Sequence, residues 1–452
     1  MKKNSSKTFK PTQPLTTINP DAAGIDLGSE EIYVCVPYDR DPDFIRRFQT
    51  FTSDLLSILD WLKKCRIKTV AMEATGIYWI PLYELLDENG IEAHLVNPRE
   101  LKRNKKTDVQ DCQWLQQMHS YNMLAASFRP ENEICVLRAL VRHRENLFRY
   151  RAAHVQHMQK ALHQMNLQLD NVLGDITGVT GMQILRAIIE GNHDPNYLAQ
   201  FRDYRCKNSE ETIRKSLEGN YRKEHLFQLK QSLQFFDFYT SQIHDCDTEI
   251  ETIYQLVLPP IGEINQLPVP SKKIRKEKNY PNYDLRTYLF QTTGVDLTRI
   301  SGLNVLTIQT ILSETGPNLS KFPSVKHFTS WLRLSPNNRI SGGKILTSKT
   351  IRFRNRAARA FQMAAHSLAH THSPLGAYYR KMRAIFGPQK ANIATAHKLA
   401  RIFYFMITRR MEFDETLQAA FEQRHKERII KNLHRKAKQF GFQLVTFQPT
   451  VT

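Results

Sequence analysis

Four carboxylates in the first third of the chain have the types and spacing that phosphodiester chemistry requires. Asp26 lies near the end of an apolar segment, Glu73 ends another, and Asp108 and Asp111 would share one face of a helix. Clustered carboxylates repel one another unless a divalent cation neutralises them, and their hard oxygens suit Mg²⁺ or Mn²⁺. Two such ions would stabilise the attacking and leaving oxygens of a phosphodiester. Taken singly, each acid is explained as an ordinary cap or surface charge, Asp108 as the cap of its own helix.

A possible nucleophile lies much later, in a polar segment at residues 335–344 that we predict to be a loop between helices. Ser341 is followed there by Gly342, Gly343 and Lys344, and glycines let a backbone approach a phosphate closely. A serine hydroxyl is a weak nucleophile unless a base or a metal ion activates it. From the residues alone, a turn-forming serine is the simpler interpretation of Ser341.

The elements that must position the acids alternate between strands and helices. Strands are expected at 23–28, 32–36, 69–73 and 93–96, and helices at 54–64, 79–86 and 105–120. This alternation predicts a mixed α/β layer.

The rest of the chain has helical periodicity. Residues 135–166 contain neither Pro nor Gly, and together with 225–256 they predict two long helices that form a helical or coiled-coil arm. The expected domains are a disordered basic tail at 1–20, an α/β catalytic domain at 21–130, the arm at 131–258, a linker at 259–286, a mainly helical domain at 287–440 and a tail at 441–452.

The charge of the chain is unevenly distributed. Lys and Arg number 64 against 44 Asp and Glu, a formal net charge of +20. Residues 1–130 hold 17 basic and 17 acidic side chains, whereas residues 331–452 hold 23 and 5. This favours cation binding by the first part and phosphate binding by the last, although a merely solvated basic surface is the simpler alternative.

Several basic and glycine positions are expected to contact nucleic acid, mainly its backbone. The segment 297–305 resembles a helix-hairpin-helix element, with a plain packing unit as an equal contender. The expected contacts are Lys105, Lys106, Gly302, Gly342, Gly343, Lys344, Lys349, Arg352, Arg354 and Arg356.

Other classes of protein are disfavoured. The 6 cysteines form no C-x-x-C pair, which argues against a zinc site. No apolar run approaches the roughly 18 residues of a membrane span. We therefore expect a cytoplasmic, nucleoid-associated protein with no membrane partner.

Taken together, these residues resemble the transposases of the insertion-sequence 110 (IS110) family, including its IS1111 subgroup. The resemblance covers most of residues 22–410 and rests on Gly24-Ile25-Asp26-Leu27-Gly28, Met72-Glu73-Ala74-Thr75-Gly76, Lys106-Thr107-Asp108-Val109-Gln110-Asp111, Ile300-Ser301-Gly302-Leu303, Leu334-Ser335-Pro336 and Ile340-Ser341-Gly342-Gly343-Lys344. The first motif alone also resembles actin and sugar-kinase ATPases, but the later glycine-rich nucleotide loops of those proteins are missing from this sequence.

The resemblance implies a fold and a chemistry. The fold would be a RuvC-like (ribonuclease-H-like) Asp-Glu-Asp-Asp domain followed by a helical segment and a C-terminal transposase domain. Asp26, Glu73, Asp108 and Asp111 would bind Mg²⁺, and Ser341 would form a covalent phosphoserine intermediate with DNA. A structured non-coding bridge RNA would pair with donor and target DNA. A dimer or tetramer would combine the acids of one chain with the serine of another.

Two alternatives remain open at this level. One is a RuvC-like nuclease in which water attacks and Ser341 only positions phosphate. The other is a non-catalytic, basic nucleic-acid-binding protein whose acids are structural.

Overall fold

The structure is a computed structural model. It describes residues 16–74, 76–97, 107–256, 267–269, 279–350, 355–413, 430–431, 433–435 and 437–443. The chain divides into two compact units, Met1–Arg129 and Pro130–Thr452, and each is described by itself.

A five-stranded mixed sheet forms the centre of the first unit. Its order is β3-β2-β1-β4-β5, in which β1 pairs antiparallel with β2 and parallel with β4. β2 pairs antiparallel with β3, and β4 pairs parallel with β5. The strands are β1 (Ala22–Leu27), β2 (Glu31–Cys35), β3 (Ile45–Gln49), β4 (Thr69–Glu73) and β5 (Glu92–Val96).

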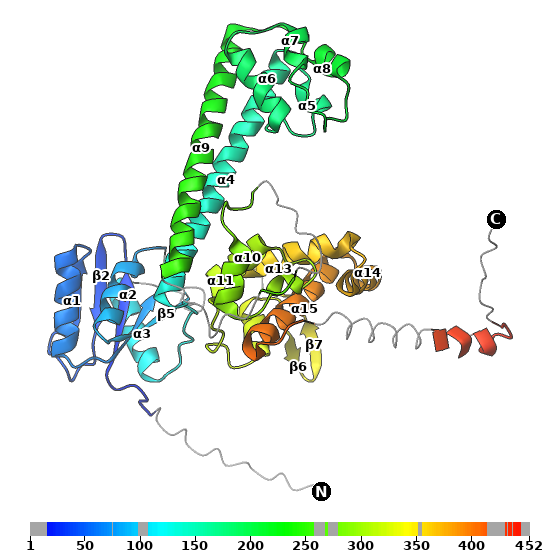
Figure 1. Cartoon of the computed structure of the whole chain (residues 1–452). Helices are drawn as coiled ribbons and strands as arrows, with labels where there is room; N and C mark the ends of the chain where they lie inside the picture. Colours follow the sequence, from blue (N-terminus) through cyan, green and yellow to red (C-terminus); the bar gives the residue numbers. More distant parts are fainter. Residues whose placement is uncertain are drawn as a thin grey trace. The chain divides into compact units, whose positions relative to one another are not determined.

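Three helices accompany this sheet: α1 (Thr52–Lys64), α2 (Trp79–Glu88) and α3 (Asp108–Ser120) (Figure 1). The core includes alternate residues of the central strands, such as Ile25 and Val34, packed with Ile58 and Leu62 of α1. The sequence did not predict β3, an edge strand with two central arginines and little apolar alternation.

Two long helices dominate the first half of the second unit. α4 (Asn132–Gln164) and α9 (Lys223–Leu256) lie side by side along much of their length (Figure 1). A buried ion pair joins them, because the Nη2 of Arg144 lies 3.2 Å from a carboxylate oxygen of Asp247 and both side chains are almost fully buried.

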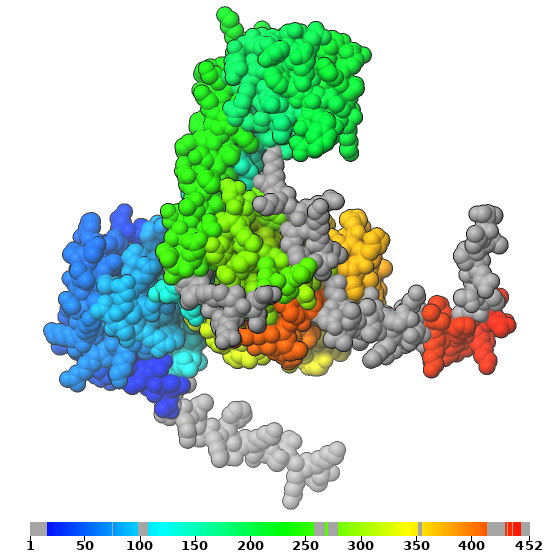
Figure 2. Space-filling view, in the orientation of Figure 1, coloured from blue at the N-terminus to red at the C-terminus, as the bar shows by residue number. Residues whose placement is uncertain are grey.

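Four short helices close the far end of this pair. They are α5 (Leu169–Val172), α6 (Val179–Ile189), α7 (Pro195–Ala199) and α8 (Glu210–Ser216). They share a hydrophobic core with the ends of α4 and α9, through Met158, Leu162 and Leu229. In the space-filling view this group is a single rounded lobe (Figure 2).

The remainder of the second unit is mainly helical. Its helices are α10 (Leu285–Thr293), η2 (Leu297–Arg299), α11 (Val305–Thr315), α12 (Val325–Trp331), α13 (Arg356–Ser367), η3 (Leu368–His370), α14 (Pro374–Phe386) and α15 (Pro388–Arg409). A short hairpin of β6 (Arg339–Ser341) and β7 (Lys344–Thr347) interrupts them. The expected fold class, an α/β domain followed by a mainly helical region, is confirmed. Within the described residues, no helix is long and apolar enough to span a membrane.

Candidate functional site

Asp26 and Glu73 lie at the carboxyl ends of two neighbouring parallel strands. The register of β1 and β4 pairs Ile25 with Met72, which places Asp26 beside Glu73 one residue further along. Both acids are half-buried. Because residues at the same register of adjacent strands face the same side of a sheet, the two side chains share one face.

Helix α3 packs on that face and runs antiparallel to β1. Gln116 donates from its side-chain amide to the carbonyl of Ala22 at 3.3 Å, and Gly24 lies under Cys112. A Cβ atom on Gly24 would lie 2.2 Å from the Cys112 carbonyl oxygen and 2.3 Å from the Gln116 nitrogen. Glycine at this position is therefore what allows the helix to approach the strand, and the first turn of α3 comes to lie toward Asp26.

Asp108 and Asp111 occupy that first turn. Thr107 caps the helix, since its side chain accepts from the Gln110 amide at 3.3 Å, so the explanation of Asp108 as the cap is wrong. Asp108 is exposed and Asp111 is half-buried. The helix was expected to begin at residue 105, but residues 98–106 lie outside the described part of the chain.

The charge of Asp26 acts on a thiol of α3. A hydrogen bond with the Cys35 thiol, burial and the negative charge of Asp26 all raise the pKa of the Cys112 thiol. Both cysteines are buried and free, and the Cys112 thiol contacts the Val109 carbonyl oxygen at 3.1 Å. Both side chains behave as apolar packing beneath the acids.

The four acids thus lie along one end of the sheet and the start of one helix. Among the described residues, however, no three His, Cys, Asp or Glu side chains gather tightly enough to enclose a metal ion. The geometry therefore shows two neighbouring strand acids and an adjacent acidic helix turn.

Ser341 lies on a two-stranded hairpin, not in the irregular loop that the sequence predicted. It ends β6 and pairs with Lys344 of β7. Gly342 and Gly343 form the turn with φ of 53° and 76°, which is the conformation that two-residue hairpin turns require. The polar composition of this segment did not indicate strands, although a Gly-Gly pair is a recognisable signal of a hairpin turn.

The hairpin presents its residues to solvent. Ser341 and Lys344 are exposed, as is Lys349 beyond β7. The aliphatic side chains of Ile340 and Ile345, which pair across the hairpin, are each 62% exposed and form a small apolar patch.

Two of the other expected nucleic-acid contacts have structural partners. Arg356 begins α13 and forms an ion pair with Glu145 of α4. Gly302 has a φ of 92°, and a Cβ there would lie 2.9 Å from the carbonyl oxygen of Ala364, so close packing against α13 explains this glycine. Four expected contacts lie outside the described residues: Lys105, Lys106, Arg352 and Arg354.

Two protein-family models match separate parts of the chain. A DEDD transposase model of the IS110 type matches residues 23–167, and a model described as transposase, IS116/IS110/IS902 family, matches residues 296–380. The chain belongs to the IS110 family of transposases. As an IS110-family transposase it acts in DNA recombination, and the family name itself refers to an Asp-Glu-Asp-Asp set. No curated protein matches the chain.

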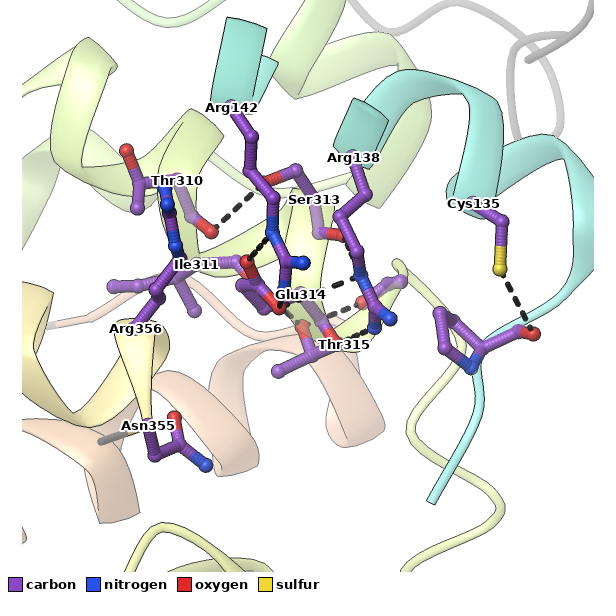
Figure 3. Close-up of polar contacts among 12 residues, drawn as sticks. Cys135, Arg138, Arg142, Thr310, Ile311, Ser313, Glu314, Thr315, Asn355 and Arg356 are labelled. Atoms are coloured by element: carbon purple, nitrogen blue, oxygen red, sulfur yellow. Dashed lines mark hydrogen bonds and ion pairs between the residues drawn. The ribbon is translucent and has the colours of Figure 1, made fainter. Parts of the chain in front are cut away.

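The structure also reveals a feature of this IS110-family chain that the sequence did not predict. Glu314 of α11 is 7% exposed, and Arg142 of α4 donates to both its carboxylate oxygens at 2.8 and 2.7 Å (Figure 3). Arg138, one turn earlier on α4, donates to the backbone carbonyls of Ser313 and Glu314 at 3.2 and 2.8 Å. Arginines spaced by four residues in α4 were the only sequence signal of this contact.

Proposed function

We propose that this transposase cuts and rejoins DNA through a covalent intermediate between Ser341 and the scissile phosphate. The observation that supports it most is the placement of Ser341 at the exposed tip of a hairpin, directly before a glycine turn and opposite Lys344. An exposed hydroxyl beside a cation and unobstructed backbone amides suits a group that must reach a phosphate.

The proposed reaction is a pair of transesterifications. The Ser341 oxygen forms a bond to phosphorus, one ester oxygen of the DNA leaves with a proton, and the serine proton passes to a base. A hydroxyl at the end of a second strand then attacks the phosphoserine and releases the serine. Because each step exchanges one phosphate ester for another, rejoining needs no ATP.

Asp26, Glu73, Asp108 and Asp111 are proposed to hold Mg²⁺, with Mn²⁺ as a substitute. Their donor set fits, because carboxylate oxygens are the ligands these ions prefer and Asp26 and Glu73 are neighbours on one face. A bound ion would polarise the phosphate and stabilise charge on the attacking and leaving oxygens. The acids themselves would orient that ion, and their charge would exclude other anions from the site.

A structured non-coding RNA is proposed to choose the DNA sites by base pairing, while the protein contacts backbones. Residues 331–452 hold 23 basic and 5 acidic side chains, which supports the binding of a large polyanion by this part of the chain. Omission of the RNA from an otherwise complete reaction should abolish recombination at the specific site.

We also propose a dimer or tetramer in which the acids of one chain act with the serine of another. The exposed aliphatic side chains of the serine hairpin support a partner that covers them. Mixing Asp26→Asn chains with Ser341→Ala chains should then restore activity that neither variant has alone, and a failure to restore it would contradict the composite site.

The decisive experiment traps the intermediate. The full chain, Mg²⁺, DNA spanning the element ends and RNA transcribed from the element's flanks are incubated and denatured, and protein-linked DNA is measured. Ser341→Ala should lose the adduct and the recombinant product, whereas Ser348→Ala, an exposed serine just beyond β7, should keep both. Recombination by the Ser341→Ala variant would contradict the proposed role of the serine. Cutting of DNA without any protein-linked product would favour a nuclease in which water attacks the phosphate.

A further inference from the structure

A large cavity lies within the second unit, between α4 and the helices α11 and α13. Its volume is about 1490 Å³, above the ~300–1,000 Å³ of ordinary small-molecule pockets. We call it the arginine groove, because one carboxylate, Glu145, and six arginines are among its lining residues: Arg144, Arg149, Arg151, Arg333, Arg356 and Arg359. A space of this size and charge suits a segment of a polyanion.

Two of these arginines already have carboxylate partners. Arg144 pairs with Asp247 of α9, and Arg356 pairs with Glu145. These ion pairs shape the walls of the groove and contribute little net charge to it.

The arginines of the next turns of α4 have neutral partners. Arg149 donates to the side-chain oxygen of Asn146. Arg151 donates to Thr240 at 3.4 Å and to the side-chain oxygen of Asn279 at 3.2 Å. Hydrogen bonds to neutral groups orient a guanidinium without neutralising its charge, so both remain available to a phosphate.

The opposite wall adds a further cation and neutral polar groups. Arg359 is exposed on α13. Asn304, Thr307 and Gln309, at the start of α11, also line the groove. Hydroxyls and amides beside arginines are the usual partners of phosphate and sugar oxygens.

The groove is continuous in sequence with the hairpin that carries Ser341. Arg333 lines it before the hairpin and Thr350 lines it after the hairpin. The eight Cα-to-Cα steps from Arg333 to Ser341 span at most roughly 29 Å when the chain is fully extended. At 3.4 Å of rise per nucleotide, that is about nine nucleotides of one strand.

We infer that the arginine groove binds the phosphate backbone of the DNA strand that Ser341 cuts, within about nine nucleotides of the scissile phosphate. This inference rests on the proposed function, which makes that strand the substrate of Ser341. The groove holds the strand through Arg149, Arg151 and Arg359, and it reads backbone rather than sequence because arginine forks match phosphate oxygens.

Photo-crosslinking on the unmodified protein tests the inference first. DNA spanning an element end carries a photoreactive nucleotide at one position at a time on either side of the cleavage site. Crosslinks from positions within about nine nucleotides should map to peptides of α4 and α13. Crosslinks from these positions that map only to other peptides would overturn the inference.

Salt dependence of binding tests the arginines themselves. The slope of the logarithm of DNA affinity against the logarithm of salt concentration should become less steep by about 1 in Arg149→Gln and in Arg359→Gln. In the double variant it should become less steep by about 2. Arg222→Gln, which removes an exposed arginine that lies outside the groove just before α9 and pairs with Glu224, should leave the slope unchanged. Circular dichroism confirms folding, which both exposed positions should tolerate.

The outcomes separate this inference from the proposed function. Ser341→Ala should lose the covalent adduct yet keep the crosslinks and the slope, so failure of the serine chemistry does not imitate failure of the groove. An unchanged slope in both groove variants would overturn the inference. So would a loss of affinity for the RNA with unaltered affinity for DNA, because the groove would then hold the RNA.

Discussion

Gly24 shows how one residue positions the acidic site. It lies two residues before Asp26 on β1, and the backbone of α3 occupies the space that a side chain would need. The glycine of the Gly-Ile-Asp motif is thus required for packing, and the approach of α3 that it allows brings Asp111 toward the strand acids.

Gly24→Ala should destabilise the first unit by about 3 kcal/mol, because its Cβ would meet backbone atoms that cannot rotate away. Urea unfolding followed by circular dichroism measures the change. Gly174→Ala, in the second unit, is the control for the glycine-to-alanine change itself, since nothing lies within 4 Å of a Cβ built there. Equal stability of Gly24→Ala and the unaltered protein would show that α3 does not lie on β1 as described.

His119 makes the stability of the first unit depend on pH. It is 2% exposed on α3, its Nε2 lies 2.8 Å from the Thr69 hydroxyl, and the His94 ring lies at 4.7 Å. Burial, and then the charge of His94, lower the pKa of His119 to about 4, while the charge of Glu92 opposes this with a smaller effect.

Acidification from pH 7 should therefore weaken this unit. In the unfolded chain this histidine is protonated below a pKa of about 6.5, whereas in the folded chain it stays neutral down to about pH 4. Between these pH values the difference lowers the free energy of unfolding by at most about 3 kcal/mol. Thermal melting between pH 7 and pH 4.5 should show the loss, and His119→Gln should flatten it. An identical pH dependence in the variant would assign the effect to other groups.

At the scale of elements, the contact between α4 and α11 determines the second unit's internal geometry. Glu314 receives Arg142 on its carboxylate, and Arg138 binds the carbonyl oxygens at the end of α11, which carry the negative end of the helix dipole. Residues of α4 and α11 also line the arginine groove, so this contact joins two of its walls.

Glu314→Gln should lower the free energy of unfolding of the second unit by about 2 kcal/mol, because two arginines lose a buried anionic partner. Urea unfolding measures it. Glu218→Gln removes a carboxylate that pairs with Arg214 on the surface and should cost under about 1 kcal/mol. If the two variants lose the same stability, the Glu314 contact is no stronger than a surface pair.

At the scale of the whole molecule, sequence periodicity predicted the fold class and most elements well. Short apolar, strand-like segments predicted β1, β2, β4 and β5, and uninterrupted helical spacing predicted α4 and α9. It missed β3 because Arg46 and Arg47 replace the apolar alternation that marks a strand. Periodicity reports which residues are buried, whereas it does not report polar contacts between distant segments.

Some parts of the candidate site could be predicted from the sequence and others could not. Asp26 and Glu73 end apolar strands, so their proximity follows from parallel pairing. The Ser341 hairpin depends on a polar Gly-Gly turn, and the arginine groove depends on α4 meeting α11 and α13, which lie more than 140 residues later in the sequence. Such long-range packing has no local signal in a single sequence.

The uneven charge of the molecule separates binding from chemistry. Residues 1–130 carry 17 basic and 17 acidic side chains, whereas residues 331–452 carry 23 and 5. Removal of divalent metal with EDTA, or the Asp26→Asn substitution, should therefore abolish cutting while DNA affinity changes less than about threefold, because the phosphate contacts come from cations elsewhere. Filter binding at several salt concentrations, at constant ionic strength with and without metal, measures affinity beside cleavage. A loss of affinity that parallels the loss of cleavage would mean that the acidic site itself holds the DNA through its metal, and the division of charge would then have no functional meaning.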